Sequence, residues 1–178
     1  MTRVTVCAAM AIARLSELAW SRHNLAGSGV TTEGRLSRAT YPLIVALHTA
    51  VIGGTVVFGR GRVRWPWLAV LIAVQPLRAW VLTTLGGRWN ARAAVPDELR
   101  IETGGPYAYV RHPNYAIIFI ELIALPLAFG VSWLAAAGTV GNVVLLAPRI
   151  IEEEAALMRR PAYRETMARR KRFIPGLF

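Results

Sequence analysis

Cysteine and acidic residues are scarce in this sequence of 178 residues, and charged residues of all kinds make up only 17% of it. Cys7, the single cysteine, lies in an apolar stretch, which excludes a disulfide framework and a CxxC redox pair, and we expect no metal site. Lys and Arg number 21 against 10 Asp and Glu, a net charge of +11. Such a charge can indicate nucleic-acid binding, but the 54% of hydrophobic residues argues against it, so we expect no nucleic-acid partner.

Five apolar stretches have the length and composition of membrane spans. A spanning helix needs roughly 20 mostly apolar residues, and 41–59 contains no Asp, Glu, Lys or Arg. The run from 115 to 151 is too long for one crossing, and Pro126 and Gly130 divide it into a tight hairpin. The sequence therefore predicts an all-α integral membrane protein of about five transmembrane helices in a single domain, 1–178. The predicted spans are 4–20, 41–59, 65–85, 115–129 and 131–151.

The first apolar stretch and the distribution of arginines predict how the chain crosses the membrane. The first stretch carries Arg14 and Glu17 and has no convincing cleavage site, so we interpret it as a retained helix. Arginines are numerous after the first, third and fifth spans and fewer on the opposite side. The positive-inside rule then places the N-terminus outside and the 89–111 loop and the C-terminus in the cytoplasm. The basic helical tail would lie against anionic membrane lipids.

Ionisable and aromatic residues gather at the predicted cytoplasmic ends of the spans. Ionisable groups beside a membrane span are functional candidates because their burial is costly. A pocket at this level would be polar at its mouth and apolar toward the bilayer, which suits a water-soluble donor and a lipid-like acceptor. The residues concerned are Arg78, Asn90, Arg92, the segment 104–115, Glu121, Arg149 and the run Glu152, Glu153 and Glu154.

The segment 104–115 combines Gly-Gly-Pro, three tyrosines and Arg-His-Pro-Asn-Tyr just before the fourth span. Pro113 biases His112 away from helical backbone angles, so the His112 side chain can face a ligand. On spacing alone, an interfacial belt of arginine and tyrosine is the favoured alternative. On spacing alone, we also interpret His48 in the second span as a hydrogen-bonded helix-packing residue rather than as a residue that binds a ligand.

Arg149 and Glu153 lie four residues apart and would share one face of a continuing fifth helix. An intrahelical ion pair at the membrane edge fits this spacing as well as a functional pair does. Three consecutive glutamates cannot all serve one arginine, so at least one carboxylate remains for a cation or for solvent. From residue chemistry, Glu153 suits a cationic group, and Arg149 suits an anionic oxygen through charge-assisted hydrogen bonds.

The motifs resemble those of the isoprenylcysteine carboxyl methyltransferase family of integral membrane enzymes that use S-adenosylmethionine. The residues that carry this resemblance are Arg111 to Tyr115, the preceding Gly-Pro-Tyr, and Arg149-x-x-x-Glu153-Glu154-x-x-Leu157. Further segments resemble a bacterial branch of this family, which is associated with type III polyketide synthases and with O-methylation of alkylpyrones. These segments lie around Arg14, Tyr41 to His48, Arg78, Leu85 to Arg92 and Glu121 to Leu127. Pro148 and Glu33-Gly34-Arg35 depart from the pattern of that branch.

This resemblance implies a methyltransferase of a bacterial plasma membrane, with a cytoplasmic cofactor pocket formed by 104–115 and 149–178. The S-adenosylmethionine-binding residues would be Tyr107, Val110, Arg111, His112, Pro113, Tyr115 and Glu153. Arg149 and Glu153 would be catalytic, and Asn90, Arg92, Glu121 and Arg149 would bind the acceptor, although Glu121 fits helix packing equally well. The acceptor would be an acidic oxygen of a lipid-like molecule, either a hydroxypyrone or phenol or a carboxylate, and the enzyme would be coupled functionally to a type III polyketide synthase.

Two other classes of function remain open at this point. The ending Ile174-Pro175-Gly176-Leu177-Phe178 is similar to that of NADPH-dependent membrane reductases of the sterol-reductase type. A non-catalytic lipid-binding or transport protein is the third alternative. The Arg-His-Pro-Asn-Tyr motif and the pair of Arg149 and Glu153 favour the methyl donor.

Overall fold

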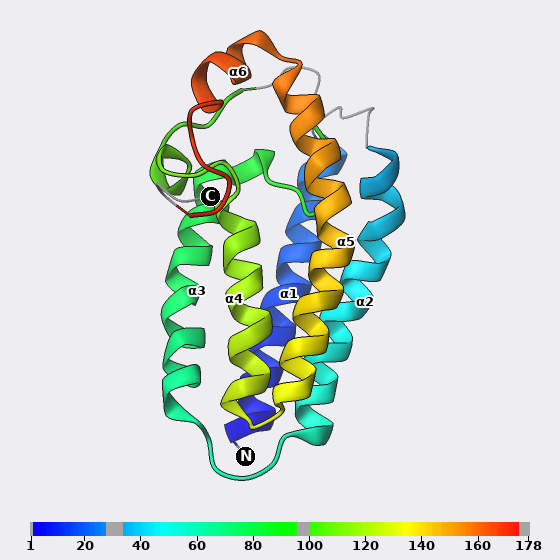
Figure 1. The fold of residues 1–178 in the computed structure, drawn as a ribbon, viewed down its shortest axis with the longest axis vertical. Helices are drawn as coiled ribbons and strands as arrows, with labels where there is room; N and C mark the ends of the chain where they lie inside the picture. Colours follow the sequence, from blue (N-terminus) through cyan, green and yellow to red (C-terminus); the bar gives the residue numbers. More distant parts are fainter. Residues whose placement is uncertain (1, 28–33, 96–99, 175–178) are drawn as a thin grey trace.

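The described part of the chain folds into a bundle of helices. The computed structural model describes residues 2–27, 34–95 and 100–174; Glu33 and the ending 175–178 lie outside them. Within these ranges the long helices are α1 (Thr2–Gly27), α2 (Arg35–Phe58), α3 (Trp65–Leu85), α4 (Pro113–Ala128) and α5 (Ser132–Met158), followed by the short α6 (Pro161–Met167) (Figure 1). Two single 3₁₀ turns, η1 (Gly86–Arg88) and η2 (Gly105–Ala108), lie in the connection between α3 and α4. The predicted all-α class is confirmed.

Four of the helices in the described ranges are long and apolar enough to cross a membrane: α1, α2, α3 together with η1, and α5. The fifth, α4, is apolar but has 16 residues, and it packs between α3 and α5. These lengths support an integral membrane protein with four to five spanning helices, as predicted. The direction in which the chain crosses the membrane stays a prediction.

Several helices extend beyond the predicted apolar spans at the same end of the bundle. Helix α1 continues to Gly27, α2 begins at Arg35 and α5 reaches Met158, whereas α3 has the predicted bounds. Hydropathy finds only the part of a helix that faces hydrocarbon, so polar helix ends are missed. Pro148 lies inside α5 without ending it. Arg149 and Glu153 therefore keep their helical spacing.

The turn between α4 and α5 forms the predicted tight hairpin. Gly130 has a φ of 77°, a conformation that strongly favours glycine. The backbone N–H of Val131 donates a hydrogen bond of 2.9 Å to the carbonyl of Pro126, which closes the turn. At this end of the bundle an apolar cluster of Cys7, Leu71, Leu125 and their neighbours joins α1, α3 and α4.

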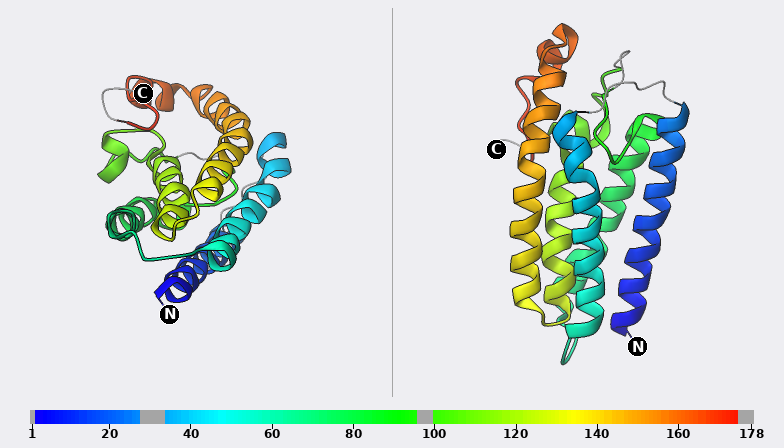
Figure 2. Two further views of the ribbon diagram at one scale, coloured as in Figure 1. Left: turned by 60° about the horizontal axis from the view of Figure 1, so that its bottom comes forward. Right: turned by 90° about the vertical axis from the view of Figure 1, so that its right-hand side faces the viewer.

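The connections that form the site lie at the opposite end, beside the last turns of α5 and α6 (Figures 1 and 2). The tail after α6 is fixed to the start of α4 by backbone hydrogen bonds of 2.9 Å from Arg111 to Lys171 and from His112 to Arg172. The guanidinium of Arg170 donates to the carbonyl of Tyr107. The segment 104–115 and the tail are thus held together in space, although they are far apart in the sequence.

Candidate functional site

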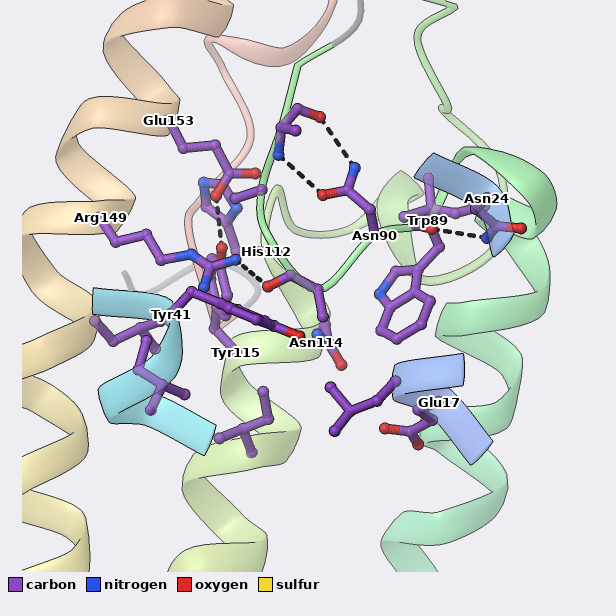
Figure 3. Close-up of a pocket in the computed structure, with 18 of the residues that line it drawn as sticks. Glu17, Asn24, Tyr41, Trp89, Asn90, His112, Asn114, Tyr115, Arg149 and Glu153 are labelled. Atoms are coloured by element: carbon purple, nitrogen blue, oxygen red, sulfur yellow. Dashed lines mark hydrogen bonds between the residues drawn. The ribbon is translucent and has the colours of Figure 1, made fainter. Parts of the chain in front are cut away.

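A cavity of about 750 Å³ extends from this end of the bundle into its interior. Its walls come from all five long helices, with Arg78 and Leu85 as the contribution of α3, and its mouth is formed by the connection between α3 and α4 and by α6 (Figure 3). Arg149, Glu153, Tyr115 and Asn114 lie at the mouth, together with Trp89 and Asn90. Deeper in the bundle, Ile44, Ile52, Ile118 and Leu146 are among the residues that line it. The cavity is therefore polar at one end and mostly apolar along its length.

His112 is held at the mouth by a carboxylate of α5. It precedes α4 with φ and ψ of −128° and 60°, outside the helical region, as Pro113 predicts. The ring stacks on Tyr115 at 5.4 Å, and Nε2 donates a hydrogen bond of 3.1 Å to Glu154. Glu154 also pairs with Arg111 at 3.1 Å. These contacts fix the imidazole in one orientation beside the cavity, which it lines.

Arg149 and Glu153 share one face of α5, and the structure gives each of them a different partner. The Tyr115 hydroxyl donates a hydrogen bond of 2.6 Å to Glu153, and the Arg149 guanidinium donates to the carbonyl of Ala91 (Figure 3). Arg149 is only 4% exposed, and its Nε has no hydrogen-bond partner among the described residues. A buried guanidinium N–H without a partner is costly, so it is a candidate group for binding a ligand oxygen.

The loop residues 89–91 cross the mouth between α1 and α5. Asn24 of α1 donates a hydrogen bond of 2.7 Å to the carbonyl of Trp89, and the backbone N–H of Ala91 donates one of 2.8 Å to the Ser21 hydroxyl. Since Arg149 bonds the Ala91 carbonyl from the other side, this loop links the two helices. It thereby forms one rim of the cavity.

The predicted acceptor-binding residues other than Arg149 have structural partners. The Asn90 amide bonds the backbone of Ala94 twice, at 3.0 and 2.9 Å, although it also lines the cavity. The Arg92 guanidinium lies over the ring of Tyr41, 5.2 Å from its centre. Glu121 accepts hydrogen bonds from Gln75, Arg78 and Arg14 inside the bundle. Arg92 and Glu121 are not among the residues that line the cavity.

The predicted cofactor-binding residues fall into two groups. Tyr107, Arg111, His112, Tyr115 and Glu153 line the cavity. Val110 instead forms a backbone bridge with Lys171, and Pro113 begins α4, so these two shape the segment without forming the cavity wall.

Two tyrosines at the mouth are protonated hydroxyl groups at physiological pH. Burial raises the pKa of Tyr163 to about 12 and raises that of Tyr107 above its ordinary value, and the nearby Glu153 adds to both shifts. At the rim, the pKa of Glu102 is lowered by hydrogen bonds from the Gly104 backbone and from Arg88. The mouth therefore offers neutral phenol donors beside carboxylates.

Sequence reasoning did not single out Tyr41, Asn114, Asn142 and Tyr163, which all line the cavity. Asn114 lies within the Arg-His-Pro-Asn-Tyr motif, and its Oδ1 is buried with no partner among the described residues. Its place in the motif was an available signal. Tyr41 likewise begins the segment Tyr41 to His48 that carries the resemblance. For Asn142 and Tyr163 the sequence carries no comparable signal, because their contribution depends on the packing of helices.

The matches to known proteins cover most of this chain. A protein-family model described as the isoprenylcysteine carboxyl methyltransferase (ICMT) family matches residues 67–159. The uncharacterized protein YpbQ of Bacillus subtilis is 30% identical over 159 residues, which are 84% of this chain and 93% of the relative. An uncharacterized protein of Haemophilus influenzae is 34% identical over 91 residues, 51% of this chain and 53% of the relative.

The names of these relatives state no activity, so the association with type III polyketide synthases stays a prediction. The family match includes the segment 104–115 and the end of α5, which carry the motifs at the mouth of the cavity. The ICMT family consists of membrane methyltransferases that use S-adenosylmethionine. This chain belongs to the isoprenylcysteine carboxyl methyltransferase family.

Proposed function

We propose that this protein transfers a methyl group from S-adenosylmethionine to an acidic oxygen of a lipid-like acceptor, at the cytoplasmic face of a bacterial plasma membrane. The observation that carries the proposal is the arrangement of the cavity. Arg149, Glu153 and Tyr115 lie at its polar mouth, and mostly apolar helix faces line its interior. This arrangement can admit a polar donor from water and an apolar acceptor from the bilayer.

The residues at the mouth fit the chemical groups of S-adenosylmethionine. Its cationic groups match the carboxylate of Glu153, and its polar nucleoside matches the hydrogen-bonding groups of His112, Asn114 and Tyr107. The unpartnered Oδ1 of Asn114 and Nε of Arg149 are buried polar atoms that a ligand would satisfy. The volume of about 750 Å³ lies in the upper part of the ordinary range for ligand cavities, so donor and acceptor can share it.

When bound, S-adenosylmethionine supplies an electrophilic methyl group on a sulfonium sulfur. The task of the protein is then to bind and orient the two reactants. Tyr115 orients the Glu153 carboxylate through their 2.6 Å hydrogen bond, and Glu154 orients His112. Holding two reactants in the correct geometry can contribute roughly 7–11 kcal/mol to lowering the barrier.

Arg149 binds the acceptor oxygen in this proposal. A hydroxypyrone, an acidic phenol or a carboxylate carries a negative charge that a planar guanidinium can hold with two N–H groups. A hydroxypyrone or carboxylate is already ionised near neutral pH, so its methylation requires no strong general base. The burial of the Arg149 side chain, which is 4% exposed, keeps water away from that oxygen. The hydrocarbon part of the acceptor lies along Ile44, Leu146 and Ile118.

The test compares defined acceptors and cofactors on purified protein in lipid nanodiscs. We expect binding of S-adenosylmethionine but not of NADPH, and transfer of a labelled methyl group to long-chain alkylpyrones, alkylphenols or fatty acids. The methyl ether or methyl ester of each acceptor is the matched control, because its oxygen is blocked. Binding of NADPH in place of S-adenosylmethionine would favour a reductase, and binding of neither cofactor would favour a lipid carrier.

A further inference from the structure

The cavity has a second polar level, deeper in the bundle than Arg149. His48 of α2 and Asn142 of α5 both line the cavity, and His48 Nε2 donates a hydrogen bond of 3.3 Å to Asn142 Oδ1. His48 is two helical turns from Tyr41 on α2, and Asn142 is two turns from Arg149 on α5. At 1.5 Å per residue, the pair lies roughly 10 Å below the mouth.

A cluster of four charged residues lies near this pair, on α1, α3 and α4. Arg78 donates hydrogen bonds of 2.8 and 2.7 Å to Glu17 and one of 3.2 Å to Glu121. Arg14 pairs with the same two carboxylates at 2.8 and 3.2 Å. Arg14, Glu17 and Arg78 line the same cavity as His48 and Asn142, so the cluster and the pair both face its interior. Two positive charges balance two negative ones, and this level is polar without a net charge.

The wall between the two polar levels is apolar. Ile44 and Val45 of α2 and Leu146 of α5 line it, each about one turn from the level above and the level below. The hydrogen bond between His48 and Asn142 joins α2 to α5, as expected of a helix-packing residue, but both side chains also line the cavity. Helix packing alone does not require these two side chains to line the cavity. Placing polar groups among apolar ones is costly unless they are hydrogen-bonded, so a ligand group that bonds to them would offset this cost.

The hydrogen-bonding capacity of the pair defines which group it can recognise. A neutral imidazole and an amide that share one hydrogen bond keep at least one donor and one acceptor between them, whichever way the ring and the amide are oriented. A hydroxyl group both donates and accepts, so it matches this pair. An anion does not match, because the charges of Arg14 and Arg78 are already compensated by Glu17 and Glu121.

We infer that His48 and Asn142 bind a hydroxyl group on the chain of the acceptor, roughly 10 Å from the oxygen that Arg149 holds. This inference rests on the proposed function for the position of the reacting oxygen. It specifies the acceptor further: the chain is apolar along Ile44 and Leu146 and carries a second oxygen where it passes His48. Lipids with a hydroxyl elsewhere on the chain leave that oxygen in an apolar part of the cavity.

The test uses the positional isomers of hydroxydodecanoic acid as probes. The isomers have nearly equal hydrophobicity, so differences among them report the position of the hydroxyl group. Their affinities are measured by displacement of a fluorescent fatty acid from purified protein in nanodiscs. We expect one mid-chain isomer, or two adjacent ones, to bind about three- to tenfold more tightly than the others, the effect of one net hydrogen bond.

Variants assign this preference to the pair. The double variant His48→Phe/Asn142→Leu removes both polar partners together, so no buried group is left unpaired, and it should bind all isomers equally. His48→Gln keeps a donor and an acceptor and should retain the preference. His23→Phe is the matched control, because His23 is exposed on α1 and does not line the cavity. Equal affinities in the unmodified protein, or a preference that survives in the double variant, would overturn the inference.

Labelled methyl transfer to the same probes separates this inference from the proposed function. Transfer with equal affinity for all isomers would support methylation of an acidic lipid and overturn the hydroxyl site. A positional preference without transfer to any acidic lipid would support the hydroxyl site and overturn the proposed reaction. Failure of every isomer to displace the fluorescent fatty acid would overturn the hydroxyl site as well.

Discussion

At the scale of single residues, three positively charged or hydrogen-bonding groups converge on Glu154. His112 and Arg111 contact one carboxylate oxygen at 3.1 Å, and Arg172 contacts the other at 2.8 Å. Glu154 does not itself line the cavity. It therefore acts on the candidate cofactor site through His112, as a positioning residue.

Replacing this carboxylate tests the role of Glu154. Glu154→Gln keeps the size of the side chain but weakens its bonds to His112 and Arg172, so we expect the affinity for S-adenosylmethionine to fall about three- to tenfold. Glu152→Gln is a matched control, because Glu152 bonds the backbone of Leu36 and Ser37 at the start of α2. Calorimetric titration of the donor measures both variants. An equal loss of affinity for S-adenosylmethionine in the two variants would show that Glu154 has no specific role in positioning His112.

Arg149 and Glu153 have opposite charges and, in the proposed mechanism, separate roles. Arg149→Lys keeps the charge and loses the planar pair of donors, so we expect normal donor binding and about 100-fold slower methyl transfer. Glu153→Gln should weaken donor binding as well, because it removes the carboxylate that Tyr115 orients. Binding and single-turnover measurements separate the two effects. Restored transfer in a variant with the two residues exchanged would identify the pair as a structural ion pair.

At the scale of the helix, the charged cluster of Arg14, Glu17, Arg78 and Glu121 attaches α1 to α3 and α4. Arg78→Leu leaves two buried carboxylates with one arginine, and we expect it to destabilise the protein by about 3–5 kcal/mol. The double variant Arg78→Leu/Glu121→Leu restores the balance of charge and should recover much of that loss. Thermal unfolding in one detergent measures both. A double variant as unstable as the single one would contradict this account of the cluster.

The elements could be predicted from the sequence to different degrees. Hydropathy identified α3 with its bounds, because Arg64 and Gly86 flank an apolar run, and Pro126 and Gly130 predicted the hairpin. The contacts that form the mouth could not be predicted, because they join residues remote in the sequence. The bond between Tyr115 and Glu153 is one example. On the sequence, Glu121 fitted acceptor binding and helix packing equally well. Its partners Gln75, Arg78 and Arg14 depend on how α1, α3 and α4 pack against one another.

At the scale of the whole molecule, the orientation in the membrane decides which compartment supplies the donor. The start of α1 and the described part of the tail after α6 lie toward opposite ends of the bundle, and the cavity mouth lies on the side of that tail (Figure 1). Cysteines introduced at Arg100 or Arg164 should react with an impermeant reagent only from the cytoplasmic side, and one at Gly61 only from outside. Cys7 is buried and gives a low background. The reverse pattern of labelling would remove the cytoplasmic supply of S-adenosylmethionine.

The central claim is that this membrane protein methylates an acidic lipid oxygen. The most direct measurement incubates the purified protein with S-adenosylmethionine carrying a deuterated methyl group and with lipid extracts of its host, followed by mass spectrometry. We predict a lipid that gains the labelled methyl group on oxygen with the unmodified protein and not with Arg149→Ala. A lipid extract without any labelled product, from protein shown to bind the donor, would contradict the claim, as would equal labelling by Arg149→Ala.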